Sequence, residues 1–287
     1  MNAVAELMSA GGQHSGCLQR PKIMGILNVT PDSFSDGGRW TTEEAVSRQA
    51  EKMLSDGADV IDIGGESTRP FAPPVTTDEE LARVLPAVRA VRRLHQTIPI
   101  SVDTTKAVVA REALAAGADL INDISALNFD PDMVKLAAEG DWPVIIMHMQ
   151  GTPGDMQVNP HYDDVVTEIR EMLTGRIEEL AAAGIARDRL IVDPGIGFGK
   201  TVEHNLEIIR RLPELQALNR PLLVGHSRKS FIGKLLADLP ATERDLPSAV
   251  VSALCVLRGA KIIRVHDVKA THQAVTITLA CQPARQA

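Results

Sequence analysis

Eight short apolar runs recur along the chain, and each is followed by a polar or charged residue. The runs lie at residues 23–27, 60–61, 98–102, 120–121, 144–147, 190–192, 222–224 and 261–263. Between successive runs there is usually room for a helix. This alternation predicts an α/β fold, a (β/α)8 TIM barrel, whose reactive side chains meet at the carboxyl ends of the strands.

The segments between these runs carry helical patterns. Apolar residues recur at helical spacing in residues 79–95, and Pro86 within that segment predicts either a kink or a late start. Further helices are expected at residues 43–54, 107–116, 130–138, 163–183, 202–212, 231–237, 247–258 and 268–280. The loops at residues 30–40 and 64–77 are long, and long loops on this face of a barrel often close over a substrate.

Length and composition fit one domain. The chain has 287 residues, of which 44% are hydrophobic, enough for a large core. The first twenty residues lack a basic start and a long apolar stretch, so they do not resemble a signal peptide. We therefore predict a flexible N-terminal extension, residues 1–20, followed by a single barrel domain, residues 21–287. No apolar run approaches the length of a membrane span.

Charge and cysteine usage limit the partners and the compartment. With 30 basic and 37 acidic residues the formal net charge is −7. Such a balance provides no basic surface for nucleic acid and argues against an anionic membrane as partner. Cys17, Cys255 and Cys281 are odd in number and far apart. They predict reduced thiols and hence a cytoplasmic location.

Three predicted strands end in residues that could form a hydrogen-bonding floor. Asp103, Asn122 and Asp193 offer two carboxylates and an amide, a set that suits a flat heterocycle with alternating donors and acceptors. Taken singly, each could instead be a helix cap or a loop anchor. Asp62 and Asp123 are interpreted as anchors of that kind, and His148 as structural.

Two later segments suggest anion binding. Residues 225–233 (GHSRKSFIG) place two cations and two hydroxyls between a strand and a helix. Arg264 and His266 project from one face of a strand end, where they could donate hydrogen bonds to a phosphate. The glycine-rich residues 193–200 (DPGIGFGK) match neither a Walker loop nor a dinucleotide fingerprint. That loop could approach a flat ligand closely or form a plain tight turn.

Together these stretches resemble the dihydropteroate synthase family of pterin-binding barrels. The resemblance runs from about residue 22 to the last helix, in the family's order. It is carried by NVTPDSFSDGG (28–38), DIGGESTRP (62–70), SVDT (101–104), INDIS (121–125), MHMQGTP (147–153), DPGIGFGK (193–200), SRKSFIG (227–233) and RVHD (264–267).

The resemblance implies a transferase of folate biosynthesis. Members condense 6-hydroxymethyl-7,8-dihydropterin diphosphate with 4-aminobenzoate to give 7,8-dihydropteroate and diphosphate. They use Mg²⁺, are typically homodimers and are targets of sulfonamides. The implied chemistry is Mg²⁺-assisted departure of diphosphate followed by attack of the arylamine. The ammonium that forms loses its proton readily, so no dedicated base is assigned.

The resemblance also implies residue roles. Arg264, His266, Lys229 and Asp103 are the expected catalytic residues, and Asn28 the expected Mg²⁺ ligand. Asp103, Asn122, Asp193 and Lys229 are expected to bind the pterin, and Thr68, Arg69, Arg264 and His266 the diphosphate. Ser230 is expected to contact the aminobenzoate carboxylate, with Phe198 and Pro70 lining that subsite.

Two residues depart from the expected family pattern. Phe71 stands where a glycine is expected, beside the entrance for aminobenzoate, and predicts altered handling of sulfonamides. His226 stands where a small or β-branched residue is expected. The alternative functions are those of a folate-dependent methyltransferase and of a non-catalytic pterin-binding paralogue. The pair of Arg264 and His266 and the first-loop motif that begins at Asn28 argue against both.

Overall fold

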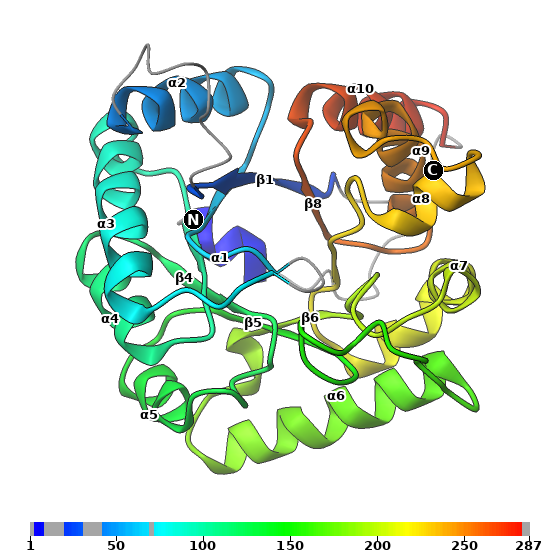
Figure 1. The fold of residues 1–287 in the computed structure, drawn as a ribbon, viewed down its shortest axis with the longest axis horizontal. Coiled ribbons are helices and arrows are strands. Elements are labelled where there is room, and N and C mark those ends of the chain that lie inside the picture. Colours follow the sequence, from blue (N-terminus) through cyan, green and yellow to red (C-terminus); the bar gives the residue numbers. More distant parts are fainter. Residues whose placement is uncertain (1–2, 9–19, 31–41, 69–71, 283–287) are drawn as a thin grey trace, which may run out of the picture.

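The computed structural model describes residues 3–8, 20–30, 42–68 and 72–282. Within these ranges eight parallel strands form a barrel surrounded by helices (Figure 1). Their order is β6-β5-β4-β3-β2-β1-β8-β7, and a bridge between Val192 and Leu222 joins the two ends of the sheet. The predicted (β/α)8 barrel is therefore confirmed.

Each strand overlaps one of the predicted apolar runs. They are β1 (Lys22–Asn28), β2 (Val60–Gly64), β3 (Ile100–Asp103), β4 (Leu120–Asp123), β5 (Val144–Met147), β6 (Leu190–Asp193), β7 (Leu223–Val224) and β8 (Ile262–Val265). Most strand positions are buried. Burial on both faces explains why the strands appear in the sequence as continuous apolar runs and not as alternating patterns.

The helices follow the expected order. They are α1 (Ala3–Met8), α2 (Thr42–Ser55), α3 (Thr77–Leu94), α4 (Ala107–Ala115), α5 (Pro131–Glu139), α6 (Val165–Ala182), α7 (Val202–Arg210), α8 (Ser230–Leu235), α9 (Asp245–Leu257) and α10 (Val268–Ala280). Short 3₁₀ helices lie at Arg187–Arg189, Leu212–Leu218 and Ala241–Glu243.

Helix α3 does not start late, contrary to one of the two outcomes expected from Pro86. It begins at Thr77 and continues through Pro86. A capping box explains the early start, because the Thr76 hydroxyl accepts from the Glu79 N–H and the Glu79 carboxylate accepts from the Thr76 N–H. The favourable cap outweighs the loss of one backbone donor at proline.

The barrel interior has an apolar layer near the amino ends of the strands. Each of seven strands contributes one buried side chain to it, and Leu7 of α1 packs against the layer with 3% of its surface exposed. The contributing residues are Met24, Val60, Leu120, Ile145, Ile191, Leu223 and Ile262. Helix α1 thus lies across the barrel opening (Figure 1), within the segment predicted as an extension. The division into an extension and a barrel domain stays a prediction.

A larger apolar cluster fills the space between the outer face of the barrel and the helices. No helix in the described parts of the chain combines the length and the apolar character needed to cross a membrane.

Candidate functional site

A layer of polar side chains lies two residues further along the strands than the apolar layer. Alternate strand residues point to the same side, so Val60 is followed inside the barrel by Asp62, Leu120 by Asn122 and Ile191 by Asp193. Asp103 of β3 pairs in register with Asn122, and Arg264 of β8 follows Ile262 in the same way. The barrel therefore brings residues that are far apart in the sequence together in one polar cluster, at the mouth formed by the carboxyl ends of its strands.

Arg264 lies at the centre of this layer. Its Nε donates to Asp62 Oδ2 at 2.6 Å, and one of its terminal nitrogens donates to Asp103 Oδ2. Asp62, with no exposed surface, also accepts from Asn122 Nδ2 at 3.3 Å. Burial alone would lower the pKa of Arg264, but the two carboxylates raise it above its ordinary value. The guanidinium is therefore charged and fixed in direction, and its second terminal nitrogen can donate to a ligand.

Two aspartates of the layer, Asp103 and Asp193, have raised pKa values. Burial raises the pKa of Asp103 above its usual range, although Arg264 opposes the shift. Burial likewise raises the pKa of Asp193, and Lys229 opposes it. Both side chains lie in a space largely closed to water, which disfavours the charged form of a carboxylate and explains the direction of the two shifts. Perturbed pKa values of this kind are concentrated at functional sites.

Lys229 reaches the mouth from the loop after β7. Its ammonium donates to the Ile196 carbonyl and lies 4.2 Å from the centre of the Phe198 ring, a cation–π contact. Burial lowers the pKa of Lys229 to about 7, with Asp193 acting in the opposite direction. Gly197 makes the approach possible, because it has φ +81° and a Cβ there would lie 2.8 Å from Lys229 Cδ. The glycine-rich loop therefore serves close packing against Lys229.

The remaining anion-binding candidates are also near the mouth. His266 Nδ1 lies 3.0 Å from Ser227 Oγ, and the same hydroxyl accepts from the His266 N–H at 3.1 Å. These contacts set the orientation of the imidazole ring. Arg228, by contrast, forms a two-pronged ion pair with Asp245 at 2.6 and 2.8 Å. It therefore anchors α9, although the sequence placed it among the cations of the anion-binding segment 225–233.

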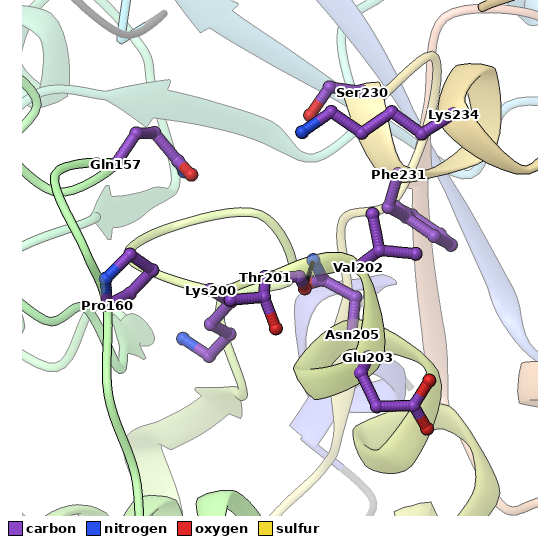
Figure 2. A pocket seen from close by; sticks show the side chains of 10 residues that line it. All are labelled: Gln157, Pro160, Lys200, Thr201, Val202, Glu203, Asn205, Ser230, Phe231 and Lys234. Carbon is purple, nitrogen blue, oxygen red and sulfur yellow. Dashed lines mark hydrogen bonds between the residues drawn. The ribbon is translucent and has the colours of Figure 1, made fainter.

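A pocket of about 390 Å³ opens beside Ser230 (Figure 2). Ser230 and Lys234 project into it from α8, and Gln157 faces them from the β5–α6 loop. Glu203 also lines the pocket, but it is paired with Arg210 at 2.5 Å. The described residues supply no ion-pair partner for Lys234. Lys234 is therefore a cation of the pocket lining that can meet a carboxylate.

A buried lysine beneath this pocket was missed by the sequence reasoning. Lys200 is 3% exposed, and its ammonium contacts His148 Nδ1 at 3.0 Å and the Phe198 carbonyl at 2.9 Å. Burial lowers the pKa of Lys200 well below its ordinary value, and it lowers that of His148 to about 2. Lys200 thus links the β5 and β6 loops and supports Phe198. A lysine at the end of a glycine-rich loop gave no signal of burial.

The residues expected to hold diphosphate and Mg²⁺ are only partly described. A Cβ placed on Gly64 would lie 3.7 Å from both Asn28 Oδ1 and Asp103 Oδ2, so these two oxygens face the same small space. Oxygen donors of this type suit Mg²⁺, which usually takes few protein ligands and completes its shell with phosphate and water. No group of three or more His, Cys, Asp or Glu able to hold a metal occurs among the described residues.

Several expected residues lie elsewhere or outside the described residues. Thr68 is half-buried at the start of the β2–α3 loop. Arg69, Pro70 and Phe71 lie outside the described residues, so the sulfonamide hypothesis on Phe71 stays a prediction. Asp123 points away from the mouth and accepts from Ser125 Oγ at 2.7 Å, as an anchor does.

Asp62 was also interpreted as an anchor, but it contacts both Arg264 and Asn122. Its position two residues after buried Val60 was the available signal.

His226 is buried behind the site. Its Nε2 lies 3.0 Å from both the Ser248 carbonyl and Ser252 Oγ, whereas its Nδ1 has no partner among the described residues. Burial lowers the pKa of His226 to about 4. The residue therefore joins β7 to α9 as a neutral imidazole and does not face the mouth.

Comparison with known proteins gives a consistent result. The family model for pterin binding enzymes matches residues 24–266. The dihydropteroate synthase of Synechocystis is 47% identical over 89% of this chain and 88% of its own length. The Yersinia pestis dihydropteroate synthase, solved with a sulfonamide drug, is 49% identical and superposes with a TM-score of 0.86, covering 92% of this chain and 94% of that one.

A third relative was solved with the reaction product. The Xanthomonas albilineans dihydropteroate synthase in complex with 7,8-dihydropteroate is 43% identical and has a TM-score of 0.85. The match covers 93% of this chain and 96% of that one. Matches of this length and identity extend across both the barrel and the polar layer at its mouth.

Proposed function

Because this chain belongs to the dihydropteroate synthases of the pterin-binding enzyme family, we propose that the polar layer at its barrel mouth binds and activates the two substrates. The chain is an enzyme of the transferase class. It condenses 6-hydroxymethyl-7,8-dihydropterin diphosphate with 4-aminobenzoate, giving 7,8-dihydropteroate and diphosphate.

The pterin ring lies on the floor formed by Asp103, Asn122 and Asp193. A carboxylate can accept from a ring N–H and its neighbouring amino group together, and the Asn122 amide can donate and accept. Asp62 supports the floor through Arg264 and Asn122. Lys229, fixed on the Phe198 ring and the Ile196 carbonyl, lies beside the pterin and can donate to its oxygen.

The diphosphate is held by Arg264 and His266, with Thr68 and Arg69 from the loop after β2. The evidence for this role is strongest for Arg264. Asp62 and Asp103 fix its guanidinium, and the N–H groups that do not contact them can donate to the diphosphate. Asn28 would hold Mg²⁺ together with phosphate oxygens, and the ion would neutralise charge that develops on the diphosphate. Charge stabilisation prepared in advance in this way is usually the largest single contribution to catalysis.

The aminobenzoate lies between Phe198 and the pocket beside Ser230. Its carboxylate is directed toward Ser230 and the ammonium of Lys234, and its amine toward the pterin methylene. As diphosphate leaves, the positive charge at the methylene is spread into the pterin ring near Asp103 and Asp193. The amine then attacks this carbon, and the product ammonium loses its proton to solvent.

The observation that carries this proposal is the convergence of Asp103, Asn122, Asp193 and Arg264 in one buried layer. The test is direct detection of 7,8-dihydropteroate from the two substrates, with Mg²⁺ and after its removal by chelation. We expect turnover that depends on Mg²⁺. A protein that binds the pterin substrate but gives no product would instead be the non-catalytic paralogue.

We also propose that the protein forms a homodimer through α9. Four exposed apolar side chains lie along one stripe of this helix at Leu246, Val250, Leu254 and Leu257. Their exposed fractions range from 38% for Leu254 to 73% for Leu246. A second copy of the chain is the partner that fits this stripe best, because a straight apolar stripe can pack against itself across a two-fold axis.

The cytoplasmic location stays a prediction from the cysteines.

A further inference from the structure

Three charged side chains outside the polar layer form a network at the base of the β2–α3 loop. Lys106 Nζ lies 2.5 Å from Glu66 Oε2 and 2.5 Å from Glu80 Oε2. Glu80 has no exposed surface, while about a quarter of the Lys106 and Glu66 side chains is exposed. The network joins three elements, since Glu66 belongs to the loop, Glu80 to α3 and Lys106 to the N-cap of α4.

The same loop is fixed at both of its described ends. Arg83 of α3 donates to the Gly65 carbonyl at 2.9 Å, and Glu66 Oε1 accepts from the Val75 N–H at 3.0 Å. One carboxylate oxygen of Glu66 therefore accepts a hydrogen bond from the far end of the loop, and the other contacts the ammonium of Lys106. Gly65 packs closely on α3, because a Cβ there would lie 2.8 Å from Val84 Cγ2.

Stability alone does not explain this network. Removing charges from water is expensive, and a buried ion pair often contributes less to stability than apolar side chains of similar size would. Glu80 also has an oxygen, Oε1, that is buried without a partner in the described parts of the chain. What a charged pair with short contacts does provide is a defined geometry for the backbone on either side.

We propose that Lys106, by bridging Glu66 and Glu80, is a positioning residue that holds residues 65–68 in place, so that Thr68 meets the diphosphate of the pterin substrate. This inference rests on the proposed function. Lys106 follows Asp103 by three residues, so the network connects the carboxyl end of β3 with the loop that carries Thr68. It acts through Thr68 and does not touch the substrate.

The proposal predicts a selective defect. The pterin floor is formed by strand residues, which do not depend on the loop, so binding of a pterin without diphosphate stays unchanged. Binding and turnover of the diphosphate substrate weaken, because a displaced loop no longer places Thr68 on the phosphate. Small displacements of positioning groups commonly cost one to two orders of magnitude in rate, so we expect about a tenfold loss in kcat/KM.

The first variant is Glu66→Gln, which keeps the shape of the side chain and an acceptor for the Val75 N–H. Calorimetry compares the Kd of the pterin diphosphate with that of 6-hydroxymethyl-7,8-dihydropterin, and steady-state kinetics gives kcat/KM. We expect only the diphosphate substrate to bind about tenfold more weakly. The control is Glu139→Gln, which breaks an ion pair of similar contact length to Arg111 at 2.7 Å, far from the loop in the sequence.

Lys106→Met alone would leave Glu80 as a buried charge, so the second variant combines Lys106→Met with Glu80→Gln. The same selective loss is expected. An equal increase in the Kd of both pterins, or a change below twofold in the Kd of the diphosphate substrate, would overturn the proposal.

Formation of dihydropteroate by the wild-type protein is measured in parallel. Its absence would count against the proposed function alone, because the two binding constants still test the positioning role.

Discussion

At the scale of single residues, two carboxylates determine the charge and the orientation of Arg264. Asp62 and Asp103 keep the guanidinium charged and directed. Replacing Arg264 by alanine should lower kcat by a factor of about one hundred or more, because a charged donor to the leaving group is lost. Product formation is measured together with thermal unfolding, so that loss of fold is separated from loss of activity. A near-normal kcat would contradict the assigned role.

Lys234 offers a test of the pocket beside Ser230. Replacing Lys234 by methionine should raise the KM for 4-aminobenzoate about threefold, the size expected for one exposed ion pair. The KM for 4-aminobenzamide, which carries no charge at that end, should stay unchanged. Lys269→Met, at an exposed lysine of α10, controls for net charge. An equal change for both amines would show that Lys234 does not recognise the carboxylate.

His226 should make the fold sensitive to acid. Its pKa in the folded protein is about 4, below the ordinary 6.5, so the folded state binds fewer protons than the unfolded state in this interval. The free energy of unfolding therefore falls as the pH decreases from 6.5 toward 4 and is unaffected by this group at higher pH. Between about pH 7.5 and about pH 5 the contribution lost is about 2 kcal/mol.

The matched variant is His226→Gln, which keeps a donor for the Ser248 carbonyl and does not titrate. Urea unfolding at the two pH values should show a smaller acid-induced loss of stability in the variant than in the wild type. Other titrating groups are common to both proteins, so they cancel. An identical loss would mean that the pKa of His226 is the same in the folded and unfolded protein, so that burial does not lower it.

At the scale of elements, α9 combines two faces with different tasks. Ser248 and Ser252 on its inner face contact His226, while Leu246 and Val250 are exposed on the outside.

A double substitution, Leu246→Glu with Val250→Glu, should place charges in the dimer contact and convert the dimer to a monomer. Sedimentation velocity measures the mass. Val108→Glu, at an exposed valine of α4, is the control, and a monomeric wild type would contradict the dimer.

Strand ends were predicted well and loops were not, for a physical reason. A buried parallel strand must be apolar, so Asp103, Asn122 and Asp193 stand out at the points where strands meet the mouth. Loop residues gain their roles from contacts between loops. Lys200 illustrates this, because its burial results from packing of the β5 loop against the β6 loop, and neither segment alone indicates it.

At the scale of the whole molecule, the residues that stabilise the fold and the residues that bind substrate lie at opposite ends of the barrel. The apolar layer with Leu7 lies at the amino ends of the strands, and the polar layer lies at the carboxyl ends. Replacing Leu7 by alanine should lower the free energy of unfolding by about 2 kcal/mol or more. The kcat/KM for both substrates should stay unchanged. These are measured by urea unfolding and by steady-state kinetics.

Glu6→Gln serves as the control for Leu7, because it weakens a partly exposed ion pair with Lys22 and should have a much smaller effect on stability. If Leu7→Ala lowered kcat/KM without lowering stability, the separation between the two ends of the barrel would not hold.

The amino-acid sequence by itself determined the alternation of strands and helices, and with it the barrel and the ends of the strands where chemistry occurs. This follows because burial on both faces of a parallel strand restricts composition strongly enough to be recognised locally. Tertiary structure alone decided which of several aspartates contact Arg264, that Lys200 is buried, and that Lys106 joins Glu66 to Glu80. Such contacts depend on distances between segments far apart in the chain, which no local pattern encodes.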